Sequence, residues 1–216
     1  MPKFEIEIKS LLGSKDQADE LIGKMKASNS GFQALGGHKQ LNHYFVNGNL
    51  AQAAEKLSVN VPVNILSAKD FSVRTRWADG KVIFVIKATV DDTTSSNGTA
   101  RQEFESAVNL TLEQLDQILL DSGFAYQAKW SRERQDFKFK DLNVSIDKNA
   151  GYGYLAEFEK VIDDQSKSDQ VKAEIRQIMS NLGVAELNQD RLARMFDFYN
   201  KNWQDYYGTE KTFNIE

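Results

Sequence analysis

The alternation of apolar and polar side chains along the chain predicts a protein that is rich in β-strands. Residues 3–10 read KFEIEIKS, in which every second side chain is apolar, as is typical of a strand with one buried face. The same alternation recurs, and it predicts strands at 3–10, 38–46, 71–77, 81–89, 101–108, about 126–138, 142–148 and 152–162. Tight turns are predicted at Ala78-Asp79-Gly80 and at Lys140-Asp141.

Helical spacing of apolar residues appears in four other segments. These are 15–28, the stretch from Thr111 to Gly123, the stretch from Ser168 to Gly183, and about 188–207. Thr111 is expected to cap its helix, with Gln114 in the capping-box position. Residues 47–70 are ambiguous, with a short helix predicted at 50–57. The predicted strands dominate and the predicted helices interrupt them, which indicates the α+β class.

Aromatic and aliphatic side chains also recur at helical spacing in the last helix. We expect them to pack this helix onto the sheet rather than to stack on a nucleobase. They are Leu192, Phe196, Tyr199, Trp203 and Tyr206.

Composition narrows the possible functions. The chain has 216 residues and a net charge of −4, which argues against binding nucleic acid or acidic membranes through bulk charge. It has no cysteine and two histidines, which excludes disulfides and thiolate chemistry and leaves little room for histidine-based metal sites. No apolar run approaches the ~20 residues of a membrane helix. We therefore expect a cytoplasmic protein, and a single domain over residues 1–216, because no linker or internal repeat is evident.

Charged side chains share faces of the predicted strands, since residues i and i+2 of a strand point to the same side. In the first strand, Glu5, Glu7 and Lys9 lie on one face and apolar residues lie on the other. The charged positions of the other strands are Arg74 and Arg76, Lys87, Arg101, Glu103 and Glu105, Arg132 and Arg134, Asp147, and Glu157 and Glu159.

Two architectures fit this pattern, and patterning alone leaves both open. An open antiparallel sheet would turn its charged face to water. A closed eight-stranded barrel with helices packed outside would instead enclose the charged side chains, which requires a charged guest, because buried ions are costly unless they are paired. Carboxylates without cysteine or histidine suit Mg²⁺ or Mn²⁺, and arginine and lysine suit phosphate oxygens. A polyphosphate with one or two metal ions fits best.

The ordered charged motifs resemble those of the CYTH, or triphosphate tunnel metalloenzyme, superfamily. Glu5-Ile-Glu7-Ile-Lys9 is similar to the ExExK signature of this family, and the later charged doublets follow in the family's order up to Glu159. The resemblance implies an eight-stranded antiparallel β-barrel. Known activities in the family include class IV adenylyl cyclases, thiamine triphosphatases and inorganic triphosphatases.

The resemblance also implies roles for individual residues. The metal-binding residues would be Glu5, Glu7, Glu103, Glu105, Glu157 and Glu159. The substrate-binding residues would be Lys9, Arg74, Arg76, Lys87, Arg132 and Arg134, with Arg101 and Lys129 as weaker candidates. The catalytic residues would be Lys9, Glu105 and Asp147, of which Asp147 would orient a basic residue or a water.

The resemblance implies a metal-dependent enzyme that hydrolyses a small triphosphate, namely inorganic triphosphate, thiamine triphosphate or a nucleoside triphosphate. The first alternative is a class IV adenylyl cyclase, and the second is a binding module without turnover. We expect no partner besides this substrate, neither nucleic acid nor membrane, and a monomer or homodimer.

Overall fold

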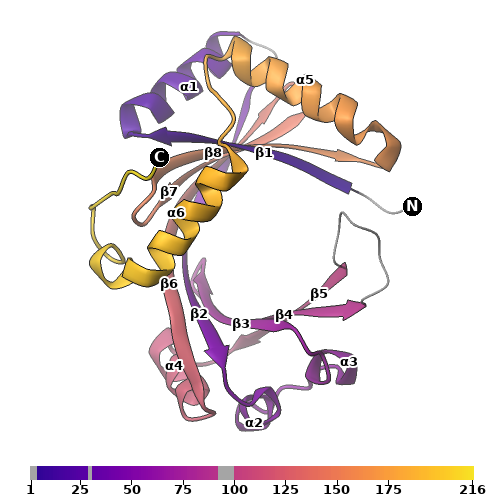
Figure 1. The fold of residues 1–216 in the computed structure, drawn as a ribbon, viewed down its shortest axis with the longest axis vertical. Helices are drawn as coiled ribbons and strands as arrows, with labels where there is room; N and C mark the ends of the chain where they lie inside the picture. Colours follow the sequence, from indigo (N-terminus) through magenta and orange to yellow (C-terminus); the bar gives the residue numbers. More distant parts are fainter. Residues whose placement is uncertain (1–3, 29–30, 92–99) are drawn as a thin grey trace. The chain divides into compact units, whose positions relative to one another are not determined.

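The computed structural model describes residues 4–28, 31–91 and 100–216 (Figure 1). The described chain contains an eight-stranded sheet in the order β1-β8-β7-β6-β2-β3-β4-β5, with antiparallel neighbours. Its strands are β1 (Phe4–Gly13), β2 (Gln33–Asn47), β3 (Phe71–Ala78), β4 (Lys81–Asp91), β5 (Ala100–Val108), β6 (Phe124–Phe139), β7 (Leu142–Asn149) and β8 (Gly153–Ile162).

The helices confirm the predicted α+β class. They are α1 (Lys15–Ala27), α2 (Leu50–Lys56), α3 (Val63–Leu66), α4 (Leu112–Leu120), α5 (Ser168–Asn181) and α6 (Gln189–Asn202). The short helix α3, which follows Pro62, was not predicted, because four residues are too few to show a helical period. None of the helices in the described ranges is long and apolar enough to cross a membrane.

The chain divides into two compact units. The first unit contains residues 1–39 and 132–216, and the second contains residues 40–131. This division does not test the single domain that we expect from the sequence, which stays a prediction. The strand registers confirm the predicted antiparallel sheet. The strand order has β1 and β5 at its two ends, so the closure of the sheet into a barrel stays a prediction.

In the first unit, the apolar face of the sheet packs under α1 and α5 (Figure 1). Ile8 of β1, Val144 of β7 and Phe158 of β8 contribute to one core with Leu21 of α1 and Ile175 of α5. Burying one such side chain contributes about 1.5–3 kcal/mol. The alternation that was read from the sequence thus directs one face of each strand into this core.

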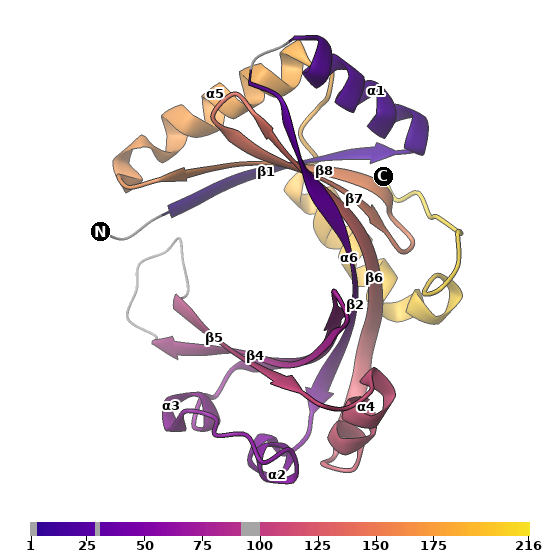
Figure 2. The same ribbon diagram turned by 180° about the vertical axis from the view of Figure 1, so that it is seen from behind.

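The second unit repeats this arrangement with other helices. Val73 of β3 and Phe84 and Ile86 of β4 pack against Leu115 and Leu119 of α4. The helices α2, α3 and α4 lie on the same side of β3 and β4 (Figure 2). Here too, one face of the strands is apolar and covered, and the other is left for polar side chains.

The predicted turns and caps are confirmed. Asp79 and Gly80 have φ values of 49° and 77°, and they join β3 to β4 in a two-residue turn. Lys140 has a φ of 54° in the equivalent turn between β6 and β7. Thr111 caps α4 in a capping box with Gln114.

The aromatic face predicted for the last helix is right in part. Tyr199 is fully buried, and it contacts the rings of Tyr152 and Phe213. Phe196 is 46% exposed, so its assignment to the buried face was wrong. The residue that shares the buried face with Tyr199 is Met195, because residues four apart lie on the same side of a helix.

Candidate functional site

The polar side of the first unit's sheet gathers charged residues from four strands. Glu7 is paired with Glu159 in the β1–β8 register, and Lys9 with Glu157. Because directly opposite residues of antiparallel strands share a face, these side chains point to one side. Arg134 is paired with Asp147 in the β6–β7 register and continues the same surface. We call this surface the first charged face, and its members are Glu7, Lys9, Arg132, Arg134, Asp147, Glu157 and Glu159.

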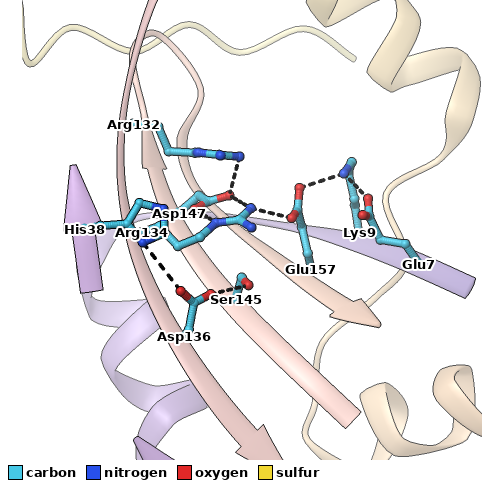
Figure 3. Close-up of polar contacts among 9 residues, drawn as sticks. All are labelled: Glu7, Lys9, His38, Arg132, Arg134, Asp136, Ser145, Asp147 and Glu157. Atoms are coloured by element: carbon cyan, nitrogen blue, oxygen red, sulfur yellow. Dashed lines mark hydrogen bonds and ion pairs between the residues drawn. The ribbon is translucent and has the colours of Figure 1, made fainter. Parts of the chain in front are cut away.

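Lys9 lies between two carboxylates. Its Nζ donates to Glu157 Oε1 at 2.7 Å and also to Glu7 (Figure 3). Burial opposes the charged form of Lys9, but Glu157 and Glu7 outweigh it and raise the pKa of Lys9. Burial likewise opposes ionisation of Glu157, yet Lys9 and Arg134 hold its pKa below the ordinary value. Both groups therefore stay charged at neutral pH.

Arg134 forms the densest contacts of the first charged face. Its Nε and Nη2 donate to the two carboxylate oxygens of Asp147 at 2.7 and 2.6 Å, and Nη2 also reaches Glu157 (Figure 3). Asp147 is 1% exposed, and Arg132 lies 3.6 Å from it. Asp147 therefore accepts from Arg134 with both carboxylate oxygens, and the orienting role that the sequence analysis gives it stays a prediction.

The sequence analysis missed three polar residues beside this face, namely Asp136, Asn143 and Ser145. Asn143 donates to Glu159 Oε1 at 2.9 Å. Ser145 donates to Asp136 Oδ1 at 2.7 Å. Asn143, Ser145 and Asp147 alternate along β7 with buried apolar residues, so their period of two was a usable signal.

The polar side of the second unit's sheet carries a second charged face, which consists of Arg74, Arg76, Lys87, Glu103 and Glu105. Lys87 and Glu103 are directly opposite in the β4–β5 register. Glu103 accepts from Arg74 Nη2 at 2.7 Å and lies 3.2 Å from Lys87 Nζ. Arg76 Nη1 donates to Glu105 Oε1 at 2.7 Å.

Glu103 is the acidic centre of the second charged face. Burial opposes its ionisation, but the hydrogen bond from Lys87 and the charges of Lys87 and Arg74 lower its pKa. Arg74 Nη1 also donates to the Tyr44 hydroxyl at 3.0 Å. Within the described part of the chain, the buried Nε of Arg74 has no hydrogen-bond acceptor. Arg74 therefore keeps one donor for a further anionic oxygen.

Two neighbours of this face on β2 were also missed. Tyr44 accepts the hydrogen bond from Arg74, and Asn42 Oδ1 accepts one from Arg76 Nε at 3.1 Å. Both alternate with the apolar side of β2, and they lie opposite Arg74 and Arg76 in the β2–β3 register.

Not all predicted site residues can be placed. The side chains of Glu5 and Arg101 lie outside the described part of the structure, although the backbone of both belongs to strands. Lys129 lies 3.8 Å from Asp116 of α4 and 4.1 Å from the centre of the Tyr126 ring.

The carboxylates of the first charged face have the chemistry to hold a divalent cation. Among the described residues, no three acidic or histidine side chains form a group that could hold a metal ion. The Lys9 ammonium nevertheless shows that Glu7 and Glu157 converge on one positive charge. Glu7 and Glu159, directly opposite in register, would repel each other without a cation nearby. Their carboxylate oxygens are the ligand type that Mg²⁺ or Mn²⁺ prefers, and a metal site formed by them stays a prediction.

A cavity of about 400 Å³ lies in the second unit. Phe45 and Phe71 contribute to its wall together with Ser72 and Gln127. Ser72 is directly opposite Lys87 in the β3–β4 register, so the cavity adjoins the second charged face.

Comparison with known proteins matches nearly the whole chain to one family. The sequence model of the CYTH domain matches residues 3–193. A Methanocaldococcus jannaschii protein named "Putative adenylate cyclase MJ0240" is 27% identical over 185 residues, which cover 86% of this chain and 93% of that protein.

Solved structures resemble the fold. A Vibrio parahaemolyticus protein described as a "putative adenylate cyclase" has a TM-score of 0.56 at 12% identity and covers 91% of this chain and 99% of its own. The PH1012 protein of Pyrococcus horikoshii has a TM-score of 0.54 at 17% identity, with coverage of 87% and 93%. At these identities the structures show a shared fold.

Proposed function

This chain belongs to the CYTH family, and on that basis we propose that it is a divalent-metal-dependent enzyme that hydrolyses a small triphosphate. The observation that carries the proposal is the second charged face, where the guanidinium groups of Arg74 and Arg76 and the ammonium group of Lys87 lie close together around Glu103 and Glu105. Arginine forks match phosphate oxygens, and lysine adds a compact charge. The buried Nε of Arg74 is a donor that a phosphate oxygen would satisfy.

Every basic residue of the two charged faces is paired with a carboxylate. We propose that phosphate oxygens replace these carboxylates when the substrate binds. Arg74 and Lys87 would then turn from Glu103 to the phosphate chain, and Glu103 would be released. The exchange keeps each buried cation paired, which avoids the cost of leaving it alone.

The first charged face would supply the carboxylates for a cation. Glu7 and Glu157, which converge on the Lys9 ammonium, would contribute oxygen ligands to Mg²⁺ or Mn²⁺. Glu5, Glu103, Glu105 and Glu159 stay predicted ligands. Such an ion, when bound, neutralises phosphate oxygens and acidifies a coordinated water.

The chain's own groups would carry the rest of the reaction. Lys9 and Arg134 would bind the phosphate oxygens, and Asp147 would keep Arg134 in its forked orientation. A water oxygen attacks the terminal phosphorus, and the bond from that phosphorus to its bridging oxygen breaks. A carboxylate such as Glu105 takes the water proton, and the remaining diphosphate leaves.

A second candidate is an adenylyl cyclase, which two observations favour. The Methanocaldococcus relative carries that name. The 400 Å³ cavity has two aromatic residues in its wall, together with Ser72, the register partner of Lys87, and it would take the nucleoside. In this reaction the ribose 3′-hydroxyl attacks the α-phosphorus, and pyrophosphate leaves.

Separation of products tests the two candidates. The protein is incubated with inorganic triphosphate, thiamine triphosphate or ATP, each with Mg²⁺ or Mn²⁺ and each with a metal-chelated control. Release of inorganic phosphate supports the hydrolase, and cyclic AMP with pyrophosphate supports the cyclase. If no triphosphate gives a product but binding persists, the chain is a binding module and the proposal is wrong.

A further inference from the structure

A buried carboxylate lies behind the second charged face, on the side of the sheet that α4 covers. Asp116 of α4 is 3% exposed. Its Oδ1 accepts from Thr75 Oγ1 at 2.6 Å, and its Oδ2 accepts from the Tyr126 hydroxyl at 2.7 Å. His43 Nδ1 lies 2.7 Å from Oδ2. Thr75 and His43 are themselves buried.

The position of Asp116 within α4 is unusual. Its helical neighbours on the buried face are Leu112, Leu115 and Leu119, and a fourth apolar residue would complete that stripe. Burial opposes ionisation, but hydrogen bonds from His43, Thr75 and Tyr126 lower the pKa of Asp116. A charged acceptor is therefore kept in the apolar core, where it can act only through the groups that donate to it.

Two of those groups, Thr75 and His43, belong to β3, which carries both arginines, and to the neighbouring strand β2. Thr75 lies between Arg74 and Arg76 on β3, and His43 lies directly opposite Thr75 on β2. The immediate neighbours of His43 are Asn42 and Tyr44, which accept hydrogen bonds from Arg76 and Arg74. Successive side chains of a strand point to opposite faces. A tether at Thr75 and His43 therefore fixes the backbone from which both arginines project.

We propose that Asp116 is a positioning residue for triphosphate binding. Through Thr75 and His43, it sets the spacing and direction of the Arg74 and Arg76 guanidinium groups. This inference rests on the proposed function, because it assigns the second charged face to phosphate.

The test compares two substitutions at one position of the tether. Thr75→Val keeps the β-branched shape of the side chain and removes the hydroxyl that donates to Asp116, whereas Thr75→Ser keeps the hydroxyl. Asp116→Asn is a third variant, which keeps the shape of the side chain and removes its charge. Affinity for inorganic triphosphate is measured by calorimetry with Mg²⁺, and urea unfolding is measured in parallel.

A matched control separates positioning from loss of stability. Ser122 is 2% exposed, lies just after the end of α4, and donates its hydroxyl to the Ile118 carbonyl at 2.8 Å rather than to Asp116. Ser122→Ala removes one buried hydroxyl contact, as Thr75→Val does. We expect it to lower stability and to leave the dissociation constant for triphosphate unchanged.

We expect Thr75→Val and Asp116→Asn to raise that dissociation constant about tenfold, because the arginines lose their fixed direction, and Thr75→Ser to stay within about twofold. Equal affinity of Thr75→Val and wild type would overturn the inference, as would a Thr75→Ser protein as weak as Thr75→Val. If Asp116→Asn does not fold, the two Thr75 variants decide the question. Wild-type protein that binds no triphosphate would overturn the proposed function itself, a result distinct from variants that bind as well as wild type.

Discussion

Replacing Glu157 with glutamine removes the charge that joins Lys9 and Arg134, two of the basic residues of the first charged face. Glu157 accepts from Lys9 at 2.7 Å and from Arg134 at 2.5 Å, and its side chain is 18% exposed. Glutamine keeps the shape and one carbonyl acceptor. Lys9 keeps Glu7 as a partner, and Arg134 keeps both hydrogen bonds to Asp147. Neither cation is therefore left alone.

The magnitude follows from these contacts. A hydrogen bond to a charged group contributes about 1.5–3 kcal/mol, and two are weakened here. Because both cations keep a partner, we expect a net loss of about 2 kcal/mol in the free energy of unfolding. For a chain of this length, that lowers the melting temperature by about 4–8 °C. Turnover should fall at least about a hundredfold, since the variant loses a predicted metal ligand.

The control is Glu133→Gln, the same substitution at a glutamate that pairs with Lys39 at 3.0 Å but is 54% exposed. An exposed ion pair contributes less than about 1 kcal/mol. Urea unfolding, thermal denaturation and phosphate release are measured for both variants. A Glu157→Gln protein that matches Glu133→Gln in stability and turnover would refute both the energetic reasoning and the metal assignment.

Three further outcomes are expected. Because the pKa of Glu157 is lowered in the folded protein, its ion pairs stabilise the fold fully above the unfolded-state pKa of about 4.3, and this stabilisation is lost as the pH falls through the folded-state pKa. Below the unfolded-state pKa, the free energy of unfolding should therefore fall more steeply with pH in wild type than in Glu157→Gln. Equal slopes of the two proteins at acid pH would contradict this. Gly153→Ala would place a Cβ 2.2 Å from the Gly13 carbonyl oxygen at a φ of 72°, so we expect the free energy of unfolding in urea to fall by about 3 kcal/mol. Gly208→Ala, at a φ of 73° and with nothing within 4 Å of its Cβ among the described residues, should cost about 1 kcal/mol. Removing divalent metal with a chelator should abolish phosphate release, and adding Mg²⁺ or Mn²⁺ should restore it; release that persists in the chelator would count against the metal requirement.

The faces of the strands could be predicted from the sequence because their period of two depends only on neighbouring residues. Ile6 and Ile8 enter the core, while Glu7 and Lys9 point to the other side. The turn at Gly80 was predictable for the same local reason, since glycine readily adopts a positive φ.

The partners of each charged group could not be predicted, since they depend on register between distant strands. Lys9 and Glu157 are 148 positions apart, and only the β1–β8 ladder sets them opposite each other. A shift of one residue would turn one set of side chains to the other face.

The buried contacts of His43 were only partly predictable. The sequence shows only that histidine is rare in this chain, whereas the structure buries His43 against Asp116. Asp116 lies within a stripe of leucines on α4, and the sequence gives no signal for its partners, because they come from other elements. Its contacts with β2, β3 and β6 become visible only in the folded chain.

Calorimetric titration with inorganic triphosphate and Mg²⁺ tests whether the arginines of the charged faces bind triphosphate, as the proposed function requires. Wild type is compared with Arg74→Ala from the second face, Arg134→Ala from the first, and Lys56→Ala, whose ammonium bonds only the Asp121 carbonyl among the described contacts. Each arginine variant should bind at least about tenfold more weakly, whereas Lys56→Ala should bind like wild type. Arginine variants that bind triphosphate as tightly as wild type would show that the charged faces do not bind phosphate.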